Sequence, residues 1–104
     1  MQNETQLEEI REKSAGRAQL IFKHSTRCSA SAIVKGRLDR AEKPEAIDFY
    51  YLDLINYRPV SNKVTDLFRI DHESPQVLLI RDGQCIYDES HMGITMADIV
   101  EAAA

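Results

Sequence analysis

The sequence predicts an α/β fold in which helices pack on both faces of a mixed sheet of about four strands. Short apolar runs alternate along the chain with segments whose apolar residues recur at helical spacing. The last two runs are separated by Asp82-Gly83, a dipeptide typical of a tight hairpin. The chain has 104 residues, which is the length of one domain, and we expect that domain to cover residues 1–104.

The first helix and the first strand lie on either side of a glycine. Leu7 and Ile10 stand three residues apart among charged side chains, which predicts a helix over Asn3–Lys13 that Gly16 ends. The next segment, Ala18–Lys23, has a compact apolar centre. This pattern is typical of a strand that is covered on both faces.

The second helix follows a polar segment that contains Cys28. Ile33, Val34 and Leu38 recur at helical spacing as the chain runs toward Glu42. We therefore expect Cys28 to lie at the junction between a central strand and the start of a helix.

The second strand is expected over Ile47–Leu54, which is rich in aromatic and branched residues and lies between Pro44 and Pro59. Pro59 suits the first turn of the helix that follows. The apolar positions of that helix, at helical spacing, are Val60, Val64, Leu67 and Phe68.

The last part of the chain predicts a hairpin and a closing helix. Its strands are expected over Gln76–Arg81 and Gln84–Tyr87 and must be antiparallel. Thr95 with Asp98 three residues later resembles a capping box, with Asp in place of Glu. The apolar stripe of the closing helix is Met96, Ile99, Val100 and Ala103.

Strands separated by helices are most simply parallel, whereas the hairpin strands cannot be. The order of helix, strand, helix, strand, helix, strand, strand, helix therefore predicts a mixed sheet. It fits a thioredoxin-like fold.

Composition and charge exclude several classes of function. The chain carries 17 acidic and 13 basic side chains, a net charge of −4, whereas nucleic-acid binding needs an excess of Lys and Arg. No stretch approaches the roughly 18 apolar residues of a membrane span. Residues 1–13 are charged where a secretion signal would be apolar, so we expect a cytoplasmic protein.

The two cysteines, Cys28 and Cys85, are too few and too far apart for a disulfide scaffold or a structural zinc site. His24 and Cys28 lack a third ligand placed by the sequence, so we expect no metal. Each cysteine is then either a buried small hydrophobe or a reactive thiol.

Cys28 is the candidate nucleophile. A thiol at the first turn of a helix faces amide groups without intrahelical partners and the positive end of the helix dipole, and Arg27 adds a cation. Such settings lower a cysteine pKa from about 8.5 to roughly 3.5–7.5. The alternative is that Cys28 only fills space. We favour the reactive thiol, because polar residues flank it at the edge of the sheet where ligands bind.

Ser31 stands where a dithiol oxidoreductase carries its second cysteine, one helical turn from Cys28. Serine cannot form a disulfide, so another thiol must resolve any mixed disulfide on Cys28. The Ser31 hydroxyl can donate a hydrogen bond to the thiolate. Alternatively, Ser29 or Ser31 only satisfies amides at the start of the helix.

The segment His72 to Gln76 comes directly before a buried strand. An X-Pro bond is the only kind for which the cis isomer is inexpensive, so Ser74-Pro75 is a candidate cis turn beside the thiol, with the Ser74 backbone open to a partner. The alternative is an ordinary trans proline that opens the strand.

The remaining candidates have weaker support. His24 and His72 could tune the thiolate or move a proton, although most single histidines have neither role. Cys85 lies in the hairpin, where a structural role is favoured over a resolving or sensing one. Phe49, Tyr50 and Tyr51 are expected in the core or on the sheet surface.

Three segments together resemble the YtxJ-like proteins, the monothiol bacilliredoxin family of the thioredoxin superfamily. They are Phe22 to Ser31, Arg58 to Asn62 and His72 to Gln76. The resemblance covers nearly the whole chain. It implies a thioredoxin fold, with Cys28 as the nucleophile and Pro75 as the cis-proline of the active site.

The resemblance also implies a substrate class. Family members attack mixed disulfides between proteins and bacillithiol, so S-thiolated proteins would be the partners and a bacillithiol-type thiol the co-substrate, with no bound cofactor. Thr26, Ser29, Ser74 and Pro75 would contact the substrate, and Arg27 and Ser31 would assist Cys28. The family usually has proline after the cysteine. Here Ser29 takes that position and leaves an additional amide donor at the helix start.

The leading hypothesis is a monothiol thiol-disulfide oxidoreductase that removes a small thiol from protein cysteines. The alternatives are a thioredoxin-fold binding or stress protein without turnover, and a redox sensor in which Cys28 and Cys85 cooperate. The sequence does not predict the oligomeric state.

Overall fold

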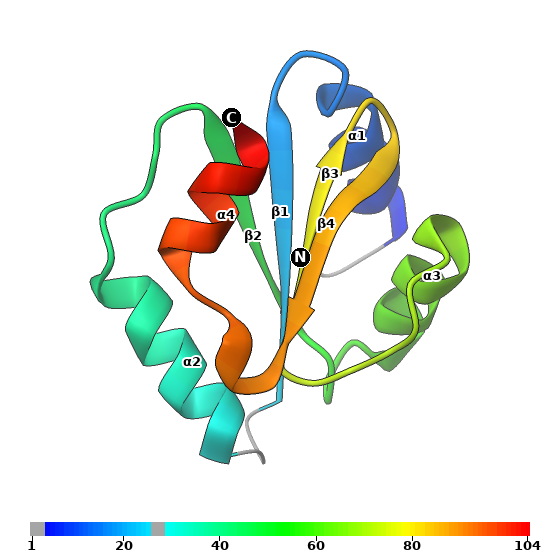
Figure 1. The fold of residues 1–104 in the computed structure, drawn as a ribbon. Coiled ribbons are helices and arrows are strands. Elements are labelled where there is room, and N and C mark those ends of the chain that lie inside the picture. The colour runs from blue at the N-terminus through cyan, green and yellow to red at the C-terminus, as the bar shows by residue number, and fades with distance from the viewer. Residues whose placement is uncertain (1–3, 26–28) are drawn as a thin grey trace.

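The computed structural model describes residues 4–25 and 29–104, which form a four-stranded sheet in the order β2-β1-β3-β4 (Figure 1). The strands are β1 (Ala18–His24), β2 (Ile47–Asp53), β3 (Gln76–Arg81) and β4 (Gln84–Ser90). β1 pairs parallel with β2 and antiparallel with β3, and β3 pairs antiparallel with β4. The mixed sheet predicted from the order of elements is confirmed.

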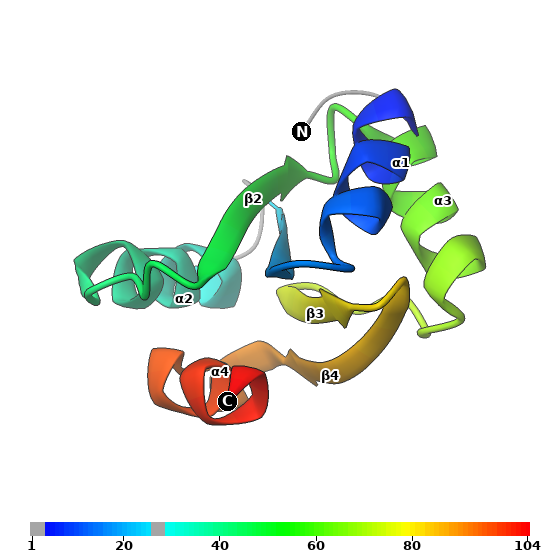
Figure 2. The same cartoon turned by 90° about the horizontal axis from the view of Figure 1, so that it is seen from above.

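Helices cover both faces of this sheet (Figure 2). They are α1 (Glu4–Lys13), α2 (Ser29–Arg40), α3 (Arg58–Phe68) and α4 (Met96–Ala103), together with the short 3₁₀ helix η1 (His91–Gly93). α1 and α3 pack on one face, and α2 and α4 pack on the other. None of the helices in the described part of the chain is long and apolar enough to cross a membrane.

Every residue of β1 is buried, because the two faces of this central strand belong to two different apolar cores. Leu20 and Phe22 lie in the core under α2 and α4. Ile21, between them in the sequence, lies in the core under α1 and α3. The period-2 alternation of strand side chains distributes the apolar run in this way.

Two elements differ from the expectation by more than one residue. β4 continues to Ser90, three residues beyond the predicted end at Tyr87. It is an edge strand whose burial alternates, so the polar residues after Tyr87 belong to a half-exposed strand rather than to a loop. α2 ends at Arg40 rather than near Glu42.

The apolar stripe of α2 also differs from the expectation. Ile33 was expected on the packed side of the helix, but it is 54% exposed. The buried positions are Ser31, Val34 and Leu38. Ser31, rather than Ile33, therefore takes the first buried position of the helix.

The strand pairing brings several distant segments to one edge of the sheet. Lys23 near the end of β1 pairs with Gln76 at the start of β3, which pairs with Ser90 at the end of β4. The backbone N–H of His91 donates to the Pro75 carbonyl over 2.9 Å. The end of β1, the segment before β3 and η1 are therefore neighbours.

Candidate functional site

The candidate site lies at this sheet edge, where β1 ends and α2 begins (Figure 1). Thr26, Arg27 and Cys28 lie outside the described residues. Ser29 is the first residue of α2 and is exposed. A helix therefore begins at the residue that follows Cys28 in the sequence, as expected.

Ser31 is completely buried and bonds to the end of β1 rather than to the start of its own helix. Its Oγ lies 2.6 Å from Nδ1 of His24 and accepts a hydrogen bond from the backbone N–H of Ser25 over 3.1 Å. The Ser31 hydroxyl thus connects the first turn of α2 to His24 and Ser25 at the end of the central strand.

His24 is 4% exposed and packs between aromatic rings. Its ring centroid lies 5.1 Å from that of Tyr51 and 5.9 Å from that of Phe22. Burial lowers the pKa of His24, and the ammonium of Lys35 lowers it further. His24 is therefore neutral at pH 7, because its ordinary pKa of 6.5 is already below that pH.

The proline segment faces the same edge. The Ser74–Pro75 peptide bond is cis, Pro75 is buried, and the ring of His91 lies 3.1 Å from the carboxylate of Glu73. The Ser74 Oγ is buried and has no hydrogen-bond partner among the described residues. The start of α2 and the Ser74–Pro75 turn thus lie at the same edge of the sheet.

The opposite face of the sheet holds a buried lysine at this edge. Lys23 is 0% exposed, and its Nζ lies 3.2 Å from Oγ1 of Thr65 and 3.3 Å from Nδ1 of His72. Burial, and secondarily the charge of Arg58, lower the pKa of Lys23 to about 8. Burial lowers the pKa of His72, and the charges of Lys23 and Arg58 lower it further.

The two histidines singled out by the sequence are therefore separated. His24 contacts Ser31 on the α2 face, whereas His72 contacts Lys23 and lies toward α3. Sequence reasoning missed both contacts. The only signal for them was the odd and even alternation of Lys23 and His24 on a strand covered on both faces.

Cys85 lies at the far end of the sheet. It pairs with Ile80, which pairs with Gln19 near the start of β1. Its thiol donates to the Tyr87 carbonyl over 3.3 Å, and burial raises its pKa to about 11. These contacts favour the structural role.

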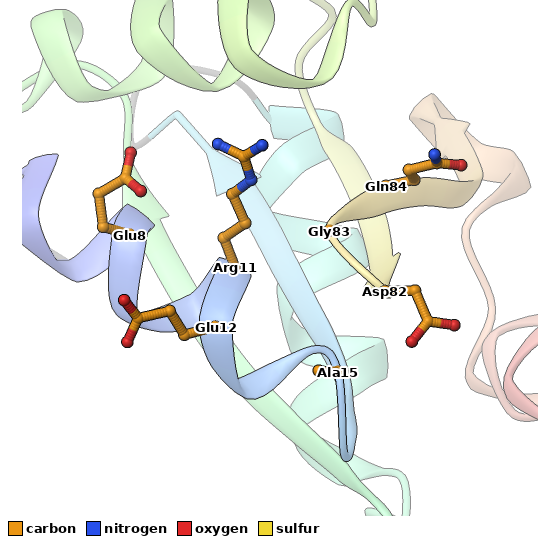
Figure 3. Close-up of a pocket in the computed structure, with 7 residues that line it drawn as sticks. All are labelled: Glu8, Arg11, Glu12, Ala15, Asp82, Gly83 and Gln84. Carbon is orange, nitrogen blue, oxygen red and sulfur yellow. The ribbon is translucent and has the colours of Figure 1, made fainter.

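A surface hollow also lies at the far end of the sheet (Figure 3). It has a volume of about 590 Å³ and lies between α1 and the β3–β4 turn, where Arg11 extends between Glu8 and Gly83. No cysteine, histidine or serine lines it. Within residues 4–25 and 29–104 no three His, Cys, Asp or Glu side chains are grouped so as to hold a metal ion.

A family model described as monothiol bacilliredoxin BrxC matches residues 1–99. A protein described as a candidate oxidoreductase with a thioredoxin fold is similar to the chain, with 23% identity and a TM-score of 0.87, and the match covers 100% of this chain and 91% of that one.

Two thioredoxins are similar in fold. The match to Malassezia sympodialis thioredoxin has 15% identity and a TM-score of 0.80 and covers 100% of this chain and 89% of that one. The match to Fasciola hepatica thioredoxin has 15% identity and a TM-score of 0.74 and covers 95% and 89%. At these identities the likeness shows the thioredoxin fold, which confirms the predicted fold class.

Proposed function

The chain belongs to the monothiol bacilliredoxin family, and from this premise we propose that it removes a bacillithiol-type small thiol from mixed disulfides on proteins through Cys28. The family and the thioredoxin fold assign the chain a role in thiol redox chemistry. The specific reaction, the small thiol and the protein partners are our proposal.

The reaction consists of two thiol-disulfide exchanges. The Cys28 thiolate attacks the small-thiol sulfur of the mixed disulfide, and the protein cysteine leaves as a thiolate that takes up a proton. Cys28 then carries the small thiol. A second small thiolate attacks that adduct, releases Cys28 as a thiolate and leaves as a symmetric disulfide. One disulfide bond breaks and one forms in each step, so no further oxidant or reductant is needed.

The observation that carries the proposal is the start of α2 at Ser29, the residue after Cys28, at the edge that also holds Ser74 and Pro75. Amide groups at a helix start stabilise a thiolate. Ser31, at the position of a second cysteine, cannot form a disulfide, which supports resolution by an external thiol.

The remaining roles follow from position. Arg27 adds positive charge beside the thiolate, and Ser31 supplies a hydroxyl one helical turn away. Thr26, Ser29, Ser74 and Pro75 contact the substrate. The reaction uses no bound cofactor and no metal.

The test uses a model protein whose only cysteine carries a small thiol. We expect the wild-type protein to release that thiol and to carry it as a mass adduct on Cys28, and we expect Cys28→Ser to do neither. The matched control, Cys85→Ala, removes the other thiol and should release at the wild-type rate. Equal release by the wild type and by Cys28→Ser would eliminate the proposal in favour of a binding protein without turnover.

A further inference from the structure

His24 at the end of β1 and Ser31 near the start of α2 are two polar side chains that are buried in contact with each other. Ser31 is 0% and His24 4% exposed, and 2.6 Å separates Oγ from Nδ1. Burying polar groups is costly unless they bond well. An apolar side chain at position 31 would carry no such cost, so the polar pair suggests a purpose other than packing.

We propose that His24 is a positioning residue that acts through Ser31 and directs the hydroxyl hydrogen of that serine either toward the Cys28 sulfur or away from it. The proposal rests on the proposed function, since it takes Cys28 as the nucleophile. It assigns His24 a role beyond that function.

A serine hydroxyl has one hydrogen and two acceptor sites, and the Ser25 N–H occupies one acceptor site of Ser31. In the first arrangement Ser31 donates its hydrogen to Nδ1 of His24, whose own proton is on Nε2. In the second, Nδ1–H of His24 donates to the second acceptor site of Ser31, and the hydroxyl hydrogen is free for another acceptor.

The Cys28 thiolate is that acceptor. Ser31 follows Cys28 by three residues in the sequence, the spacing of about one helical turn, and a thiolate accepts a hydrogen bond from a hydroxyl more strongly than a thiol or a disulfide sulfur does. With a thiolate at Cys28, the second arrangement is favoured. When the sulfur is bonded to a small thiol, its negative charge is gone and the first arrangement returns. The His24 ring then loses its proton at Nδ1 to water and gains one at Nε2.

The surroundings of His24 keep this exchange between two neutral forms. Burial lowers the pKa of His24 and the charge of Lys35 lowers it further, while a hydrogen bond with the Ser31 backbone and the carboxylates of Asp53 on β2 and Asp39 on α2 oppose them. The Tyr51 ring covers one side of the imidazole. A neutral ring can carry its proton on either nitrogen, which is what the two arrangements require.

The first experiment measures the tautomer of His24 by ¹⁵N NMR of the imidazole in the intact protein. It compares protein with Cys28 as a thiolate and protein with Cys28 alkylated. We expect the proton on Nδ1 in the thiolate form and on Nε2 in the alkylated form. The same tautomer in both forms would overturn the proposal, and this measurement needs no substitution that could unfold the protein.

The second experiment measures the pKa of the Cys28 thiol from the pH dependence of its alkylation rate. Ser31→Ala should raise that pKa by about one to two units, because one hydrogen bond to a charged group is lost. His24→Phe should raise it less, His24→Asn should restore it through its own N–H, and the double variant should titrate like Ser31→Ala alone. An undiminished effect of His24→Phe in the Ser31→Ala background would show a direct effect of the imidazole and contradict the proposal.

His72→Phe is the matched control, because it removes a histidine that does not contact Ser31. Its effect on the Cys28 pKa should be the same with serine or alanine at position 31. Both measurements use the free protein. Failure to release a small thiol would therefore contradict the proposed function and leave the His24 result intact, whereas an unchanged tautomer would contradict only the present inference.

Discussion

Lys23 is buried on the central strand, although lysine is rarely fully buried without a charged partner. Its Nζ bonds to Thr65 and His72, and no carboxylate within ion-pair distance is found among the described residues. The sequence placed this lysine at the end of a strand, where it could reach solvent. It is buried because α3 and the segment before β3, both distant in the sequence, cover it.

Lys23→Met should therefore stabilise the protein at neutral pH. Folding lowers the pKa of Lys23 from 10.5 to about 8, so above pH 10.5 the amine is neutral in both states and costs the folded protein nothing. As the pH falls from 10.5 through about 8, the amine becomes charged and the free energy of unfolding decreases. The shift corresponds to about 3 kcal/mol at most, less the two lost hydrogen bonds. Urea unfolding should show the gain from Lys23→Met below pH 8 and its decline between pH 8 and 10.5.

Lys35→Met is the matched control on the same protein. Its ammonium lies 2.6 Å from the Asp39 carboxylate, which raises the pKa of Lys35, so its contribution has the opposite sign. Lys35→Met should lose stability below pH 10.5. A Lys23→Met variant that is less stable than the wild type at pH 7 would show that the two hydrogen bonds outweigh the cost of the buried charge.

Elements with a local signal were predicted well. The Asp82-Gly83 turn has positive φ at both residues, as a type I′ hairpin requires, and Thr95 Oγ1 accepts from the Asp98 N–H as the capping pattern predicted. The elements that differed depend on distant neighbours. β4 is extended by its pairing with β3, and Ile33 is exposed because Ser31 takes the buried position beside β1.

The contact between α1 and the hairpin gave no sequence signal. Ser14, the buried residue after α1, accepts a hydrogen bond from the Gly83 N–H over 2.9 Å and donates to the Arg11 carbonyl over 2.5 Å. Its own carbonyl accepts from the Asp82 N–H over 2.9 Å. One serine thus connects the end of a helix to the turn of a distant hairpin.

Ser14→Ala should cost about 1–2 kcal/mol, because it leaves the Gly83 N–H without its partner. Amide hydrogen exchange gives a sharper test, since the substitution removes one of two adjacent bonds. The Gly83 amide should exchange faster, while the Asp82 amide, whose bond is to the Ser14 backbone, should retain most of its protection. Equal acceleration of both amides would instead show that the whole turn has detached from α1.

At the scale of the molecule, the sequence predicted which segments meet but not which side chains touch. The order of elements places the start of α2 and the Ser74–Pro75 turn at one edge, because β1 and β3 are neighbours in this topology. The contact of Ser31 with His24 depends on how α2 packs on the sheet. The separation of His24 from His72 instead follows from the alternation along β1, because His72 contacts Lys23, which lies on the opposite face of the strand from His24.

The length of the sheet separates Cys85 from the candidate site and argues against a disulfide sensor. Cys85 lies level with Gln19, five residues before His24 on β1, which at about 3.3 Å per residue is roughly 17 Å. Ser31, three residues after Cys28 in the sequence, is held at the His24 end by its contacts with His24 and Ser25. A disulfide requires Cα atoms within about 7 Å.

Mild oxidation of the intact protein in the absence of small thiols should therefore form no bond between Cys28 and Cys85. Cys85 should also alkylate slowly at neutral pH, because burial raises its pKa to about 11 and keeps it protonated. Mass spectrometry of the oxidised, alkylated and digested protein checks both statements, and Cys85→Ala supplies the reference in which the cross-linked peptide cannot form. A cross-linked peptide in the wild-type digest at low protein concentration would require the sheet to open, and it would restore the sensor hypothesis.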